Sequence, residues 1–241
     1  MAVVGFRYLY LGSEAGAEEL ALKAVVEGNT VTVSGTPAGS GTGVSRVVFR
    51  EEGGVVRAEI YTVPKTFLSR GEFRETYTAG GEVTEVWAGG LPLWEGGTEI
   101  GPLPARLFAA KTPYLGDMPA SGRLAGLLGI GDRFGPYANR LQTGAEPYGW
   151  TLTLEHLIPE EAELSSRESM AADSYLLLAT VENLGYVTWE YRTGAGAQSY
   201  TVTAEDASAF AGQDIKLCAE TASSLQALTD SLRPGRTGLS E

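Results

Sequence analysis

The sequence predicts two domains: an N-terminal all-β, sandwich-like unit and a C-terminal α+β unit with an antiparallel sheet and packed helices. Of the 32 glycines, 18 precede Pro102, and all six aspartates lie at or after Asp117. Short alternating segments fill the first part, and helical periodicity begins after the Gly101-Pro102 pair. Such a shift in composition is typical of a domain boundary. We therefore expect domains over 1–101 and 102–233 and a flexible tail over 234–241.

The N-terminal part shows β-rich segments at short spacing. Strands are expected at 20–27, 30–34, 44–51, 55–61, 73–78, 83–88 and 91–94. The turn Glu52-Gly53-Gly54 predicts a hairpin between its flanking strands, and Gly80-Gly81 predicts a second hairpin. Six or seven strands joined by glycine-rich turns are typical of a small β-sandwich.

The C-terminal part mixes both periodicities. Helices are expected at 103–110, 120–130, 168–183 and 220–232, with a short one ending at Ala211. Thr203 and Asp206 have the spacing of a capping box that would begin the short helix. Strands are expected at 148–154, 186–192 and 199–203, the last two as a hairpin. Helices gathered against an antiparallel sheet describe an α+β domain.

Composition excludes several kinds of function. The chain has one histidine, His156, and one cysteine, Cys218, so it cannot supply a multi-histidine or Cys/His zinc site, nor an internal disulfide. Its net charge of −12 repels phosphate backbones, which argues against a nucleic-acid partner. No apolar run of membrane-spanning length is present, so we expect no membrane span in this chain.

Two loops carry the candidate ligand-binding residues. The first, Lys111-Thr-Pro-Tyr-Leu-Gly-Asp117, would present Lys111, Tyr114 and Asp117 to a ligand. Its alternative interpretation is a rigid connector in which Asp117 caps the next helix and Tyr114 packs. The second loop contains Glu146 and would bind a sugar or peptide together with Tyr148 and Trp150. Its alternative interpretation is a hairpin loop leading into a half-buried strand.

The sequence supplies no evident catalytic centre. A glycosidase needs only two carboxylates, and Asp117, Glu146, Glu155 and Asp173 provide enough acids, but no spacing singles out a pair. His156 follows a β alternation and is expected to face solvent or satisfy a local hydrogen bond. We therefore expect a protein that is not an enzyme, with no catalytic residue, metal or cofactor.

Several motifs of the second half occur in a recognisable order. They are Lys111-Thr-Pro-Tyr-Leu-Gly-Asp117, the leucines at 124–128, Leu141-Gln-Thr, Glu146-Pro-Tyr-Gly149, the segments 171–183 and 186–191, Tyr200-Thr-Val-Thr and Gly212-Gln-Asp-Ile215. Over residues 103–232 the chain resembles an uncharacterised extracytoplasmic domain of Gram-positive bacteria. That domain occurs in lipoprotein-like exported proteins and in the outer portion of membrane metallopeptidases similar to β-lactam-sensing antirepressors. Residues 20–95 are similar to segments that precede it.

The resemblance implies a location rather than a reaction. It brings no catalytic residues, and the zinc motif of the metallopeptidases is absent from this chain. It implies a non-catalytic binding or sensor module of the cell envelope, extracytoplasmic or membrane-anchored, with the native anchor upstream. The partner would be an unknown small molecule or an envelope protein. A carboxylate-dependent glycan hydrolase and a structural envelope spacer are the alternatives.

Overall fold

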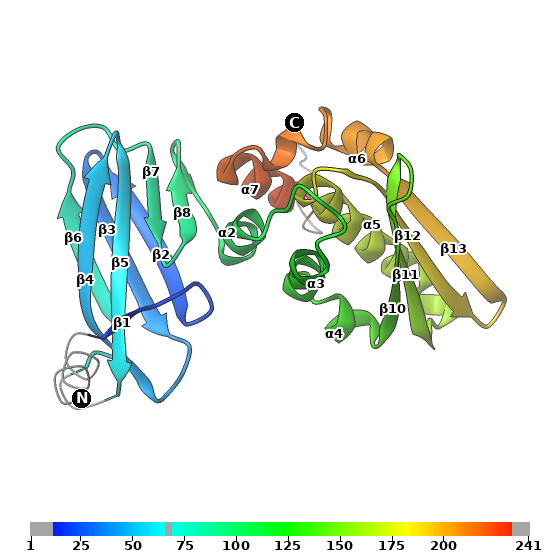
Figure 1. The fold of residues 1–241 in the computed structure, drawn as a ribbon, viewed down its shortest axis with the longest axis horizontal. Helices are drawn as coiled ribbons and strands as arrows, with labels where there is room; N and C mark the ends of the chain where they lie inside the picture. The colour runs from blue at the N-terminus through cyan, green and yellow to red at the C-terminus, as the bar shows by residue number, and fades with distance from the viewer. Residues whose placement is uncertain (1–11, 66–68, 233–241) are drawn as a thin grey trace, which may run out of the picture. The chain divides into compact units, whose positions relative to one another are not determined.

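The computed structural model describes residues 12–65 and 69–232 (Figure 1). Contacts between residues divide the chain into two compact units, residues 1–109 and 110–241. The flexible tail expected at 234–241 lies outside the described residues. None of the described helices combines the length and the apolar character that crossing a membrane requires.

The first unit contains nine strands and one helix within the described residues. They are β1 (Ser13–Glu14), β2 (Leu20–Glu27), β3 (Thr30–Pro37), β4 (Thr42–Glu52), β5 (Val55–Pro64), β6 (Phe73–Thr78), β7 (Glu85–Ala88), β8 (Leu91–Glu95), β9 (Thr98–Glu99) and α2 (Pro102–Ala109). One sheet has the order β1-β5-β7-β8-β9, with β4 also paired to β5, and the other has the order β2-β3-β6. Figure 1 shows the two sheets as separate layers.

Alternation of side chains explains how the two sheets form a core. In β3, Val31 and Val33 are buried while their neighbours are partly exposed, and in β5 the same holds for Val56, Ala58 and Ile60. Successive residues of a strand point to opposite faces, so each sheet turns one apolar face inward. The all-β, sandwich-like character predicted for this part of the chain therefore agrees with the observed strands.

Of the two hairpins predicted for the first unit, the structure forms only the one around Glu52-Gly53-Gly54. β4 and β5 pair antiparallel around Glu52-Gly53-Gly54, as expected. The hairpin predicted around Gly80-Gly81 is wrong, because β6 pairs with β3 in one sheet while β7 pairs with β5 and β8 in the other. The two glycines thus link different sheets. Turn residues mark where a chain reverses, but they do not specify the strand with which it pairs.

The second unit contains four strands and five α-helices within the described residues. They are α3 (Met118–Leu127), α4 (Ile130–Phe134), β10 (Tyr137–Gln142), β11 (Tyr148–Leu157), α5 (Glu163–Thr180), β12 (Leu184–Thr193), β13 (Gly196–Thr203), α6 (Ala204–Ala211) and α7 (Ala222–Ser231), with short 3₁₀ turns η1 (Glu160–Ala162) and η2 (Leu217–Ala219). The sheet has the order β10-β11-β12-β13. A mixed α+β fold in this part confirms the predicted class.

The prediction of a wholly antiparallel sheet is wrong. β11 and β12 run parallel, whereas the β10–β11 and β12–β13 pairs are antiparallel. The chain passes from β11 to β12 through the 18-residue helix α5, and a parallel pair needs such a crossover. One face of the sheet buries Trp150, Leu152, Val187 and Trp189. Helix α5 packs against this sheet through β12 and β13.

Several helix boundaries differ from expectation, and helix α5 begins at Glu163, five residues before the expected start. The helix expected at 120–130 is interrupted at Gly129, whose φ of 66° lies in the left-handed region, and α4 begins immediately after it. Glycine adopts this conformation without the steric penalty of a Cβ. Helix α5 ends at Thr180, three residues earlier than expected, because Leu184 already belongs to β12.

Candidate binding site

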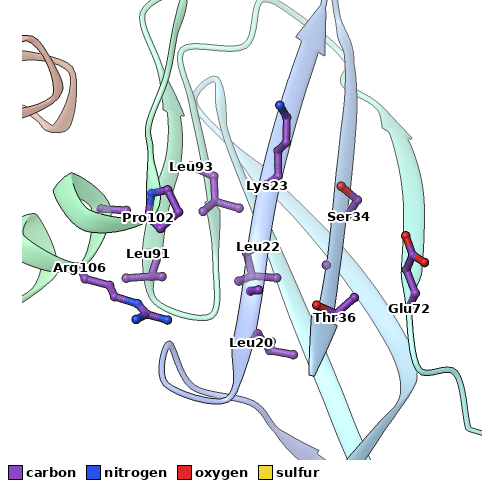
Figure 2. Close-up of a pocket in the computed structure, with 13 residues that line it drawn as sticks. Leu20, Leu22, Lys23, Ser34, Thr36, Glu72, Leu91, Leu93, Pro102 and Arg106 are labelled. Atoms are coloured by element: carbon purple, nitrogen blue, oxygen red, sulfur yellow. The ribbon is translucent and has the colours of Figure 1, made fainter. Parts of the chain in front are cut away.

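A groove in the first unit is one candidate site. It has a volume of about 320 Å³ and lies between α2, the strands β2 and β3, and the strand β8. Figure 2 shows its lining residues. One wall of this groove is formed by Pro102, Ala105 and Arg106, which the sequence analysis placed in the second domain. We call it the α2 groove; its lining residues are Leu20–Lys23, Ser34–Thr36, Glu72, Leu91, Leu93, Pro102, Ala105 and Arg106.

Leucine side chains form the floor of the α2 groove. Leu20, Leu91 and Leu93 are buried, with 1%, 4% and 2% of their surface exposed. Leu22 is half-buried and Pro102 is exposed, so both present apolar surface at the opening. Apolar pockets with a few polar groups at defined positions are the usual form of small-molecule sites.

Arg106 gives the α2 groove its polar feature. It stands in the last turn of α2, and its guanidinium extends toward Leu20 and Leu22 (Figure 2). Its Nε atom is buried and has no hydrogen-bond partner in the described part of the chain. A buried donor without an acceptor is uncommon in native proteins and calls for an explanation. Because the buried Nε is covered by protein atoms, the acceptor of a ligand would bind the two Nη atoms of the same guanidinium.

The two other charged residues of the α2 groove differ in their surroundings. Lys23 Nζ lies 2.9 Å from Glu99 Oε1, so its charge is already compensated by a surface ion pair. Glu72 is exposed and stands on the opposite side of β2 and β3 from Arg106 in Figure 2. Arg106 is therefore the one cationic lining residue without a carboxylate partner among the described residues.

The loop of Lys111, Tyr114 and Asp117 is held mostly by contacts within the second unit. Lys111 Nζ donates to the carbonyl of Ala219, and Asp117 Oδ1 accepts from the amide of Ala120 at 3.1 Å as the N-cap of α3. Asp117 therefore has the capping role that the alternative interpretation gave it. Tyr114 is 67% exposed, so it does not pack as that interpretation expected.

The second predicted loop lies between β10 and β11. Glu146 is exposed, Tyr148 is half-buried, and Trp150 is 1% exposed. The indole Nε1 of Trp150 donates to Asn139 Oδ1 at 2.8 Å. Trp150 thus belongs to the core of the sheet and is not available for stacking on a ligand, which corrects its place among the candidate binding residues.

A second hollow, of about 440 Å³, lies over β11, β12 and β13. Its carboxylate is Glu190, which accepts from Arg140 at 2.9 Å and from Thr153 at 2.7 Å. The bond from Thr153 follows from the sheet register, which places Thr153 beside Glu190. Because both carboxylate oxygens are already hydrogen-bonded, this hollow has a less available polar group than the α2 groove.

Two buried ionisable groups lie elsewhere in the second unit. Burial raises the pKa of the Asp173 carboxyl from 3.8 to about 6, although Arg133 Nη1 at 2.8 Å opposes this rise. Burial lowers the pKa of the Lys216 ammonium from 10.5 to about 8, although Asp214 and Glu182 oppose this fall. Both groups bind other parts of the protein, so we assign them structural roles.

The remaining candidates for chemistry are dispersed. His156 is exposed, and a Cβ added at Gly135 would lie 2.4 Å from its Nδ1, so the imidazole lies directly against that glycine. Cys218 is 3% exposed, and its Sγ accepts from Gln213 Nε2 at 3.2 Å. Across the described residues, no three His, Cys, Asp or Glu side chains gather in a way that could hold a metal ion.

Comparison with known protein families gives a match mostly in the second half of the chain. A family model described as "Domain of unknown function (DUF4825)" matches residues 107–203, which include the sheet β10–β13 and helix α5. No curated protein and no solved structure matches the chain. The match is consistent with the uncharacterised domain family that the sequence resembles, over a shorter range than residues 103–232.

Sequence reasoning did not find the α2 groove. It expected a helix at 103–110 and strands at 20–27 and 91–94, but it did not bring these three elements together. One signal was present: an arginine that follows Leu103, Pro104 and Ala105 in a short apolar helix. The groove itself depends on which strand faces that helix, and local patterns do not contain this information.

Proposed function

We propose that this chain is a non-catalytic binding module of the bacterial cell envelope. The observation that carries the proposal is the α2 groove, in which a leucine floor meets Arg106, whose buried Nε has no hydrogen-bond partner among the described residues. A folded protein seldom leaves a buried polar atom without a partner unless the site has a use for it. Binding a ligand is the simplest such use.

The placement of the acids favours binding over hydrolysis. Glycosidases place two carboxyl groups roughly 5 to 9.5 Å apart across the bond that they cleave. Among the described residues, the one carboxylate that lines the α2 groove is Glu72, and the one that lines the hollow on the sheet is Glu190. The acids named from the sequence have other surroundings: Asp117 caps a helix, Asp173 is buried, and Glu146 and Glu155 are exposed.

The location in the cell envelope rests on sequence similarity. The motifs between Lys111 and Ile215 resemble an extracytoplasmic domain of Gram-positive bacteria, and the matching family model covers part of the same range. In this proposal the chain is exported or anchored, and it presents its binding site outside the membrane. An envelope spacer without a ligand is the weaker alternative, because it gives no role to the groove or to the Arg106 Nε that lacks a hydrogen-bond partner in the described part of the chain.

A thermal-shift screen combined with a turnover assay tests the proposed function. The full chain is heated alone and with apolar carboxylates, peptides, cell-wall fragments and β-lactams, and soluble glycans are incubated with the protein and analysed for products. A ligand that binds the native state at 100 times its Kd adds about 2.7 kcal/mol of stability. We expect stabilisation by at least one class and no glycan cleavage. Release of glycan products by the pure protein would contradict the proposal.

A further inference from the structure

We propose that the α2 groove binds a small monocarboxylate with an apolar tail, its carboxylate on Arg106 and its tail along the leucine floor. This inference rests on the proposed binding function and names the class of ligand. Neither the matching family model nor the loops predicted from the sequence includes the groove residues, which lie between positions 20 and 106. Three observations support the inference: the volume of the groove, the burial of the Arg106 Nε without an acceptor among the described residues, and the charges around the groove.

The volume sets the size of the ligand. A groove of about 320 Å³ accommodates roughly ten non-hydrogen atoms, taking about 30 Å³ for each, as for a water molecule in the liquid. A straight carboxylic acid of eight carbons has ten non-hydrogen atoms. The buried leucines Leu20, Leu91 and Leu93 lie beneath the space that its tail would occupy, and Leu22 lines the opening.

Arg106 selects a negatively charged head. Its Nε atom is shielded from solvent without an acceptor, while the side chain as a whole is half-buried. The guanidinium has therefore already lost part of its hydration, so a carboxylate at its Nη atoms displaces less water than it would at a fully solvated arginine. Arginine binds carboxylates through two parallel N–H···O bonds, which fixes their orientation.

The charges around the groove favour an anion at the Arg106 end. Lys23 is paired with Glu99, and Glu72 stands across the groove from Arg106 (Figure 2). A cationic head at Arg106 would meet an uncompensated positive charge, and a neutral alcohol would leave that charge unpaired. A chain with a net charge of −12 repels anions in general, so a site for an anion needs local positive charge of this kind.

Isothermal titration calorimetry on the full chain tests this inference. The probes are octanoate, butanoate, octanol, octylamine and N-acetyl-leucine, which separate tail length, head charge and a peptide-like source of the carboxylate. The protein variants are Arg106→Gln, Arg106→Lys and Arg74→Gln. Arg74 is an exposed arginine of β6 in the same unit, so its replacement changes the net charge equally and serves as the matched control.

We expect octanoate to bind the wild type and Arg74→Gln equally, and Arg106→Gln at least tenfold more weakly. Arg106→Lys should keep the charge and lose the bidentate geometry, giving an intermediate affinity. Butanoate should bind at least tenfold more weakly than octanoate, since each buried methylene changes affinity about fourfold. Tighter binding of N-acetyl-leucine than of octanoate would also support a carboxylate on Arg106 and an apolar tail on the leucines, with the C-terminal end of a peptide as the natural ligand.

Three results would overturn the inference. Equal affinity of octanoate for the wild type and Arg106→Gln would show that Arg106 does not bind the carboxylate. If neither octanoate nor N-acetyl-leucine binds, the groove does not bind apolar monocarboxylates. Tighter binding of octanol or octylamine than of octanoate would show that the groove selects a neutral or a cationic head group. In that last case the proposed binding function stands while this inference fails. Thermal melts of each variant show whether it is folded before its titration is interpreted.

Discussion

Arg133 in α4 donates from Nη1 to Asp173 Oδ2 in α5 at 2.8 Å, and the Asp173 side chain is 5% exposed. The same guanidinium donates from Nη2 to the carbonyl of Leu128 at 2.8 Å. One side chain therefore binds the end of α3 and the buried face of α5 while belonging to α4, which has only five residues. This contact fixes the short helix against the long one.

Replacing Arg133 with Gln should destabilise the protein. The substitution leaves a buried carboxylate without its counter-charge, and removal of one partner from a buried pair costs about 3 to 5 kcal/mol. Because Arg133 is 41% exposed, we expect a smaller loss of about 2 kcal/mol in the free energy of unfolding by urea. Arg140→Gln is the control, since its pair with Glu190 is exposed and contributes less than about 1 kcal/mol. Equal losses in both variants would contradict this role for Arg133.

The raised pKa of Asp173 predicts a pH-dependent difference between the wild type and Asp173→Asn. The folded state holds this proton up to about pH 6, whereas the unfolded chain releases it near pH 3.8. Between these values the folded state binds more protons, so this carboxyl makes the free energy of unfolding fall as pH rises. The contribution is roughly 3 kcal/mol over the window, from about 1.4 kcal/mol per pH unit.

Urea unfolding of both proteins at pH 4, 5, 6 and 7 measures this effect. The Asp173→Asn variant lacks the titrating group and keeps an oxygen that accepts from Arg133. Its stability relative to the wild type should therefore rise from pH 4 to pH 6 and then level off. A difference that stays constant over this range would show that burial does not shift this carboxyl.

Lys216→Met should also destabilise the second unit. The Lys216 ammonium donates to the carbonyls of Leu178, Val181 and Leu184 at 2.5, 2.9 and 2.7 Å, where α5 ends and β12 begins. Buried carbonyls that lose their donor cost about 1 to 3 kcal/mol each, so we expect a loss of at least about 2 kcal/mol. Lys23→Met, which breaks only an exposed pair, should cost less than about 1 kcal/mol. A melting temperature of Lys216→Met equal to that of Lys23→Met would contradict the assignment.

Thr203→Ala should weaken the start of α6. Thr203 Oγ1 accepts from the Asp206 amide at 3.1 Å, and Asp206 Oδ2 accepts from the Thr203 amide at 2.9 Å. Loss of such an N-cap costs about 1 kcal/mol, whereas Thr203→Ser keeps the hydroxyl and should stay close to the wild type. Chemical unfolding of the two variants gives the comparison. If serine and alanine destabilise equally, the hydroxyl is not the stabilising group.

The capping box of α6 shows which features a sequence can predict. Thr203 and Asp206 lie three residues apart, and both bonds form within one helical turn, so the local pattern predicted them correctly. The β4–β5 hairpin around Gly53 is of the same kind. The strand β10 was missed, because Tyr137–Gln142 is a mostly exposed edge strand without an apolar alternation.

Pairings between distant segments could not be predicted in this way. The parallel register of Trp150 beside Val187 depends on the crossover through α5, and the link between Thr78 and Glu85 depends on which sheet each strand joins. The same limit applies to the candidate site. Arg106 reaches Leu20 and Leu22 across more than 80 positions of sequence, and only the packing of α2 brings them to one groove.

Nuclear magnetic resonance of the methyl groups during a titration with octanoate tests the central claim, that the protein binds a ligand in the α2 groove without transforming it. The account predicts that the largest shifts fall on the methyl groups of Leu20, Leu22, Leu91 and Leu93, and that the octanoate signals stay chemically unchanged on prolonged incubation. Shifts confined to residues 110–232, or the appearance of a product, would contradict it.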